Sequence, residues 1–115
     1  MAHKINTLLL NAQSALNTTG VKDLRQSSPE NITVYVTFAT GSTAGVVKLY
    51  ALAKATDTVT SGQQIGSDFD LSALTAAQTY TLELSGRAFN AIGAAITTAV
   101  SGGGAPSVTV RLSGN

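Results

Sequence analysis

Residues 32–38 read Ile-Thr-Val-Tyr-Val-Thr-Phe, and this stretch decides the class of fold. Apolar residues at 32, 34, 36 and 38 alternate with Thr33, Tyr35 and Thr37. Because successive side chains of a strand point to opposite faces, this period of two predicts a β-strand with one buried face. The β-branched and aromatic content of the stretch favours the same structure.

The same alternation recurs along the chain. It predicts strands over residues 46–53, 80–85 and 108–112, with Lys48 facing away from the interior. Gly- and Ser-rich stretches at 40–45 and 101–106 predict a turn and a loop between them. The residues expected in the core include Val34, Val36, Leu49, Leu82, Leu84, Val108 and Val110.

Three segments are less regular. Residues 54–68 are rich in Thr, Ser, Gly and Gln, which indicates a loop or a weak edge strand with Ile65 turned inward. The alanines of residues 88–99 suit a helix, but Gly93 costs about 1 kcal/mol inside one. The alternation in this segment favours a strand with a small-residue face.

The N-terminal pattern fits two structures. Apolar residues between Ile5 and Leu16 follow the helical i, i+3, i+4, i+7 spacing, whereas the asparagines among them are poor helix formers. Residues 17–20 read as a turn before a short strand at 21–26. By pattern alone, residues 5–16 therefore remain a helix or a strand.

Together these segments predict an all-β fold, a single β-sandwich or jelly-roll-like domain of seven to eight strands over residues 1–115. A chain of this length suits one domain. We expect residues 1–5 to be mobile, because unanchored termini are often disordered.

Composition excludes several classes of function. Charged residues make up only 11% of the chain and the net charge is +1, so the surface is suited to packing against copies or partners. Scattered basic residues predict no nucleic-acid binding. The absence of cysteine excludes disulfides and thiolate sites. No apolar run is long enough for a signal peptide or a membrane span, so synthesis in a cytoplasm without export and no membrane partner are expected.

Few residues suggest catalysis or metal binding. His3 is the only histidine and lies near the terminus, where no surroundings hold a general base in place. Asp68 and Asp70, with Asp57 nearby, have the ligand chemistry for calcium or for acid–base work on a sugar. A role as solvated acids that form turn hydrogen bonds explains these three residues better. We therefore predict no enzyme, and no catalytic, cofactor-binding or metal-binding residues.

Two further patterns are explained by ordinary structural roles. The Gly41–Gly45 and Gly102–Gly104 stretches resemble phosphate cradles only superficially, since no helix follows either one. Tyr35, Tyr50 and Tyr80 suggest a platform for sugar stacking, but without tryptophan they fit the rim of a sandwich better.

Several stretches together resemble a recurrent type of small phage virion protein. They are Leu8–Ala15 leading to Thr19–Arg25, Ile32–Thr40 followed by Gly41–Tyr50, and the closing Gly102–Leu112. This order of strands and Gly-rich turns is similar to that of β-sandwich proteins that decorate phage capsids or lie in tail assemblies. The resemblance implies that residues 6–14 form a strand.

The same resemblance implies a function. It is that of a virion structural protein, most simply a capsid decoration or cement protein that binds the major capsid protein and stabilises the assembled shell. It also implies self-association, for example as a trimer, and location in the virion. A tail or head–tail component is the alternative within the virion. A carbohydrate-binding module using the tyrosines and the Asp68/Asp70 pair is the alternative of another class.

Overall fold

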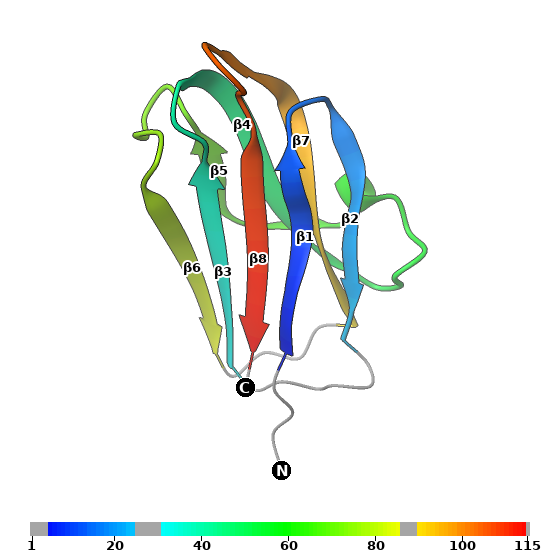
Figure 1. Cartoon of the computed structure of the whole chain (residues 1–115). Coiled ribbons are helices and arrows are strands. Elements are labelled where there is room, and N and C mark those ends of the chain that lie inside the picture. Colours follow the sequence, from blue (N-terminus) through cyan, green and yellow to red (C-terminus); the bar gives the residue numbers. More distant parts are fainter. Residues whose placement is uncertain (1–4, 25–30, 86–89, 115) are drawn as a thin grey trace.

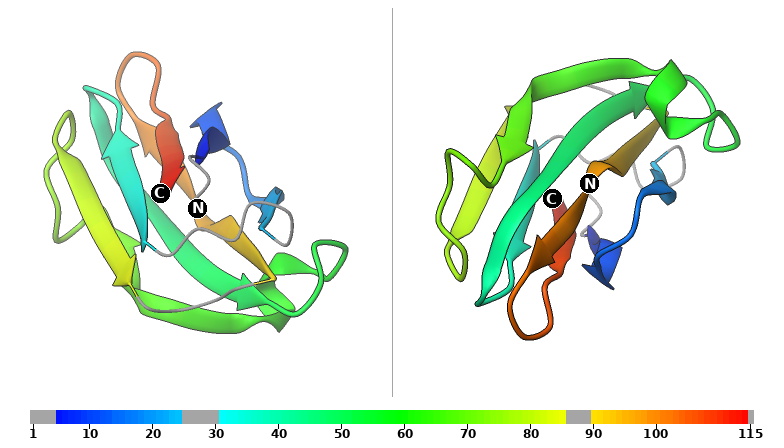
Figure 2. Two further views of the ribbon diagram at one scale, coloured as in Figure 1. Left: turned by 90° about the horizontal axis from the view of Figure 1, so that it is seen from below. Right: turned by 90° about the horizontal axis from the view of Figure 1, so that it is seen from above.

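Two four-stranded antiparallel sheets pack face to face (Figure 1). The computed structural model describes residues 5–24, 31–85 and 90–114. Sheet A contains, in spatial order, β1 (Ile5–Gln13), β8 (Val108–Gly114), β3 (Asn31–Phe38) and β6 (Thr79–Ser85). Sheet B contains, in spatial order, β2 (Asn17–Asp23), β7 (Ala91–Gly102), β4 (Ser42–Leu52) and β5 (Gln63–Asp70). Figure 2 shows the two layers from both ends.

The order of the strands is that of a jelly roll. β4 pairs with β5, β3 with β6, β2 with β7 and β1 with β8, so the antiparallel pairs are nested around the connection at residues 53–62. Pairing of β3 with β8 and of β4 with β7 completes the two sheets. The predicted all-β sandwich of seven to eight strands is confirmed, with eight strands in the part of the chain that the structure describes.

The core lies between the sheets, and the alternation in the sequence explains it. In β3 the residues at 32, 34, 36 and 38 are buried, and Thr33, Tyr35 and Thr37 are more exposed. Six of the seven residues expected in the core are buried: Val34, Val36, Leu49, Leu84, Val108 and Val110. Burial of one face from each sheet is therefore the main apolar contribution to the stability of the fold.

The prediction for Leu82 was wrong in degree. Its side chain points inward but is only partly buried. The reason is its place in the sheet: β6 pairs only with β3 and so lies at the edge of sheet A. Its neighbour across the sandwich is Gly66 of β5, where an added Cβ would lie 3.0 Å from Leu82 Cδ2, and this glycine contributes no side chain to cover the leucine.

At the N-terminus the strand predicted for residues 6–14 is confirmed as β1, Ile5–Gln13. Register shifts on either side of Leu10 interrupt its pairing with β8, and both Leu9 and Leu10 are buried. These bulges explain why the apolar spacing looks helical. Ile5, expected to be mobile, opens the strand and is buried; residues 1–4 lie outside the described part of the chain.

Two predicted turns are strand instead, residues 17–20 entirely and residues 40–45 from Ser42 on. β2 begins at Asn17, so the turn expected at 17–20 lies at 14–16; residues 25 and 26 of the predicted strand are not described. Gly20 serves a close approach, because a Cβ there would lie 2.5 Å from the carbonyl oxygen of Leu9. β4 begins at Ser42, and register shifts between Ser42 and Val47 absorb the Gly- and Ser-rich stretch as bulges.

Residues 53–62 cover part of the outer face of sheet B. This connection contains a short 3-10 helix, Val59–Ser61, and is followed by β5, which pairs only with β4. The segment expected to be a loop or an edge strand is therefore both. Fully buried Val59 completes a second apolar cluster, whose buried members are Tyr50, Leu52, Val59, Ala91 and Ala95.

β7 confirms the strand predicted in residues 88–99, although 88 and 89 are not described. Its small-residue face lies under Val59: a Cβ added to Gly93 would lie 2.9 Å from Val59 Cγ1. Ile92, Ala94 and Ile96 face the main core on the other side. Small residues are needed here because the loop lies directly on the strand.

Candidate functional site

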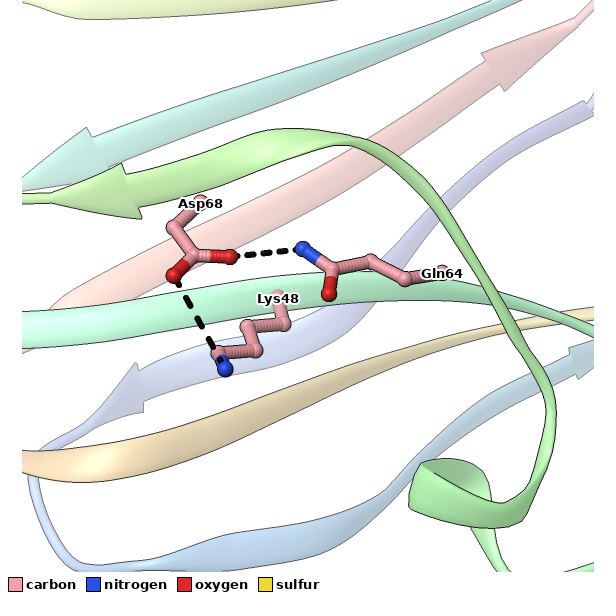
Figure 3. Close-up of polar contacts among 3 residues, drawn as sticks. All are labelled: Lys48, Gln64 and Asp68. Carbon is pink, nitrogen blue, oxygen red and sulfur yellow. Dashed lines mark hydrogen bonds and ion pairs between the residues drawn. The ribbon is translucent and has the colours of Figure 1, made fainter.

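Asp68 lies in a small polar cluster on the outer side of β4 and β5. Gln64 Nε2 donates a hydrogen bond of 2.6 Å to Asp68 Oδ1, and Lys48 Nζ lies 3.7 Å from Asp68 Oδ2 (Figure 3). Both partners of the ion pair are substantially exposed, and such pairs contribute little to stability. The cluster satisfies the Asp68 carboxylate locally.

The other two candidate acids are engaged in turns of their own. The backbone N–H of Ser72 donates to Asp70 Oδ1 at 3.0 Å, and this hydrogen bond holds the pKa of the exposed Asp70 carboxyl below its usual value. The backbone N–H of Lys54 donates to Asp57 Oδ2 at 3.1 Å. Among the residues that the structure describes, no three His, Asp or Glu side chains gather as a metal site; His3 lies outside them.

The three tyrosines do not form one platform. Tyr35 is on the outer face of sheet A, whereas Tyr50 is buried beneath the 53–62 connection on the outer face of sheet B. Tyr80 lies at the end of β6, where its hydroxyl accepts a hydrogen bond from the backbone N–H of Thr75 and donates one to Gln78. The geometry therefore does not support a sugar-stacking site made of these residues.

Four turns gather at one end of the sandwich (Figure 1). We call this surface the turn end and define it as residues 14–16, 39–41, 71–78 and 103–107. None of these residues carries a charge. Asp70 borders the surface at the end of β5.

Backbone hydrogen bonds connect the turns with one another and with neighbouring strands. Gly103 N–H donates to Gly41 O at 3.0 Å, and Ala39 N–H donates to Ser107 O at 2.8 Å. The N–H of Val100 donates to Ser14 O at 2.8 Å. The two glycine-rich stretches therefore bind each other's backbone, as adjacent hairpin turns do, and the Gly103 amide already has its acceptor.

The turn end exposes small and apolar side chains. Leu16 is 68% exposed, more than any other large hydrophobic residue in the described part of the chain. The turns also expose alanines: Ala15, Ala73, Ala77 and Ala105. An ordered, uncharged and partly apolar surface is suited to broad contact with another protein, since little entropy is lost when it binds.

The outer face of sheet A is the second exposed surface, and the strand register arranges it in rows. One row runs across β1, β8, β3 and β6 as Leu8, Arg111, Tyr35 and Thr81. The adjacent row is Asn6, Ser113, Thr33 and Glu83, and Thr109, Thr37 and Thr79 continue the face on the other side. Arg111 Nη1 donates to Asn6 Oδ1 at 2.7 Å, and the hydroxyls of Thr37 and Thr79 are 2.8 Å apart.

This face is not flat, because it has both projecting side chains and a shallow hollow. Tyr35 and Leu8 are 37% and 36% exposed, on either side of Arg111. A shallow hollow of ≈ 290 Å³ is lined by Tyr35, Thr37, Thr79, Thr109 and Arg111. Tyrosine and arginine are the residues most often found at the energetic centres of protein interfaces.

Of these residues the sequence pointed only to Tyr35, as one of three tyrosines of a possible platform. Alternation in β3 and β8 already put Tyr35 and Arg111 on the outer face, but only the strand order brings them next to each other and to Leu8. Leu16 was read as part of an apolar helical or strand pattern. Its exposure follows from the position of the β1–β2 turn, which the pattern did not locate.

The strand order and the packing of the sheets define an eight-stranded jelly-roll sandwich. The fold is similar to that of the SPBc2 prophage-derived protein YomS, whose crystal structure matches it with a TM-score of 0.59. The match covers 96% of this chain and 91% of that chain at 18% sequence identity. At this identity the similarity establishes the fold alone.

No protein-family model matches the sequence, and no curated protein matches it significantly. Within residues 5–24, 31–85 and 90–114, no helix has the length and apolar character needed to cross a membrane.

Proposed function

We propose that this protein is a structural component of a phage virion, and that it decorates the assembled capsid shell as a cement protein. The observation that carries the proposal is the fold, which is similar over nearly the whole chain to a prophage-derived protein. Jelly rolls also serve as capsid and lectin domains, so the exposed surfaces must decide between functions.

The turn end is the surface that we assign to the shell. Its four turns are uncharged and hydrogen-bonded to their neighbours, and Leu16 projects from them. The partner is the major capsid protein, contacted through a surface of similarly low charge. Because few ions are displaced or screened at such a contact, binding to shells should change little as salt concentration rises.

The mechanism is adhesion. A surface assembled from neighbouring capsid subunits exists only in the finished shell, so each bound copy stabilises the shell relative to free subunits by mass action. A specific interface takes about 800 Å² from each partner, which is roughly an eighth of the accessible surface of 6042 Å² of this molecule. Contacts repeated over a symmetric lattice gain from multivalency if copies associate.

The structure lends less support to a carbohydrate-binding module. Such a site needs aromatic rings on one surface, and here Tyr35 and Tyr50 lie on the outer faces of different sheets. The absence of enzymatic activity remains a prediction. A tail or head–tail component is the alternative within the virion, and binding to purified tails in place of shells would favour it.

The test is cosedimentation. The protein is mixed with undecorated shells assembled from the major capsid protein of the same genome, and separately with the free subunits. We expect binding to shells to be at least about tenfold tighter than binding to subunits, because only shells present the composite, repeated site. Equal binding to both, or none to shells, would reject the decoration role.

Variants then test the turn end. Leu16→Asp and Ala105→Asp place a charge on exposed positions of this surface, and each should weaken shell binding at least about tenfold through an unpaired charge at the contact. Thr60→Asp is the matched control, because Thr60 is exposed in the 53–62 connection, away from the four turns. If wild type binds shells and all three variants bind equally well, another surface makes the contact.

A further inference from the structure

We propose that the outer face of sheet A binds a second copy of this chain, forming a reversible face-to-face dimer. This contact is independent of the proposed attachment to a capsid, since it uses the sheet face and leaves the turn end free. It would also supply the association of copies that multivalent binding requires.

The two outer faces of the sandwich differ in whether another segment of the chain covers them. On sheet B, the 53–62 connection covers the small residues of β7 and buries Val59 and Tyr50 against them. On sheet A, no described segment covers Leu8, Tyr35 or Arg111. An open sheet face that presents an aromatic ring, an aliphatic side chain and a guanidinium resembles the centre of an interface.

The charges on this face are self-complementary. Glu83 lies on β6 in the row of Thr33, and Arg111 lies on β8 in the row of Tyr35, so two strand spacings and one row separate them by about 12 Å. Neither is paired with the other or with another charged side chain of the described residues.

Consider a two-fold axis that lies in the contact plane and crosses the line between Glu83 and Arg111 at its midpoint and at a right angle. This axis brings Glu83 of each copy opposite Arg111 of the other copy. That axis passes over β3 between Thr33 and Tyr35, and it therefore places the two Tyr35 side chains next to each other. This single symmetry operation forms two Glu83–Arg111 ion pairs between the copies and buries the exposed Tyr35 rings. Isologous contacts of this kind are the commonest way for proteins to form dimers.

The remaining side chains on this face lose little conformational entropy when the face is buried. Five threonines lie on it, at positions 33, 37, 79, 81 and 109. β-branched side chains have little rotamer freedom to lose on binding. Four strands spaced about 4.8 Å apart and about 20 Å long present roughly 400 Å² in projection. Two such faces bury roughly 800 Å² in total, which is below the about 1,200 Å² of stable specific interfaces, so we expect the dimer to be weak and concentration-dependent.

Analytical ultracentrifugation between about 10 μM and 1 mM tests the proposal, since interfaces of this size are typically weak. Wild type should shift reversibly from monomer to dimer, and the dimer should weaken in 0.5 M salt because its ion pairs are screened. Glu83→Arg and Arg111→Glu should each weaken dimerisation at least about tenfold, and the double variant should restore it to within about threefold. Circular dichroism verifies that each variant is folded.

A cross-link tests the geometry independently. The chain has no cysteine, so Thr33→Cys introduces one thiol beside the predicted axis. A short bis-maleimide should join two copies of this variant much faster than two copies of the exposed-position control Thr60→Cys. A protein that stays monomeric at 1 mM, single reversals without effect, a double variant that stays weak, or equal cross-linking at both positions would each overturn the proposal.

If the sheet face instead contacts the shell, wild type would stay monomeric at all concentrations and Glu83→Arg would abolish its cosedimentation with shells. That outcome rejects the dimer. Weakened shell binding in the Leu16→Asp and Ala105→Asp variants, with dimerisation intact in both, would support both assignments separately.

Discussion

Individual residues explain most of the departures from simple alternation. Leu84 and Leu82 lie on the same inward face of β6, yet Leu84 is only 9% exposed and Leu82 is partly open. The difference comes from what lies opposite each side chain. Leu82 faces Gly66 at the edge of the sandwich, and a residue without a side chain leaves part of the leucine in contact with solvent.

This difference gives the first prediction. Leu84→Ala should lower the free energy of unfolding by about 2–5 kcal/mol, because it removes buried contacts and leaves a cavity. Leu82→Ala should cost less, about 1–2 kcal/mol, since part of its surface already contacts water. Urea unfolding of the two variants and wild type measures both values. Equal losses, or a smaller loss for Leu84, would show that the burial of β6 is assigned incorrectly.

At the scale of elements, the 53–62 connection acts as a cover for one sheet. Val59 is fully buried against β7, where Gly93 and its neighbouring alanines leave room for it. Asn90 Nδ2 donates to the carbonyl oxygen of Ala53 at 2.9 Å and ties the start of the connection to β7. The second apolar cluster therefore depends on one side chain supplied by a loop.

The second prediction follows from this dependence. Val59→Ala should destabilise the protein by about 1–3 kcal/mol through lost packing. It should also raise the rate of amide hydrogen exchange in residues 53–62 more than in β3 or β8, because the cover opens locally before the sandwich unfolds. Thr60→Ala, at the exposed neighbouring position, is the control and should change neither quantity. Uniform acceleration over the whole chain would contradict the local role.

At the scale of the whole molecule, the nested pairing determines how the chain must fold. Of the four nested pairs, only the innermost joins consecutive strands, β4 and β5, and β1 must find β8 across nearly the entire chain. Loops of this length must close before their contacts are formed, which makes such topologies slow to fold.

We therefore expect refolding from urea in milliseconds to seconds rather than in microseconds. Stopped-flow measurements by far-UV circular dichroism, which should also give a β spectrum at equilibrium, test this. Completion of refolding within the dead time of the instrument would be inconsistent with the predominance of non-local strand pairs.

Alternation alone identified most of the fold. A period of two at residues 32–38, 46–53, 80–85 and 108–112 is a local property, so it identified these strands and six of the seven expected core residues correctly. Composition likewise indicated a charge-poor surface, and the absence of cysteine excluded disulfides and thiolate sites. These conclusions needed only the geometry of a strand and the cost of exposing apolar side chains.

The tertiary structure decided what the local pattern left open. The bulges around Leu10 turned a helix-like spacing into a strand, and the place of β6 at a sheet edge left Leu82 partly exposed. The rows of the outer face and the grouping of four uncharged turns depend on strand order and register. Residues 42 to 107 positions apart in the chain become neighbours on the outer face of sheet A, and no local periodicity records which strands will pair.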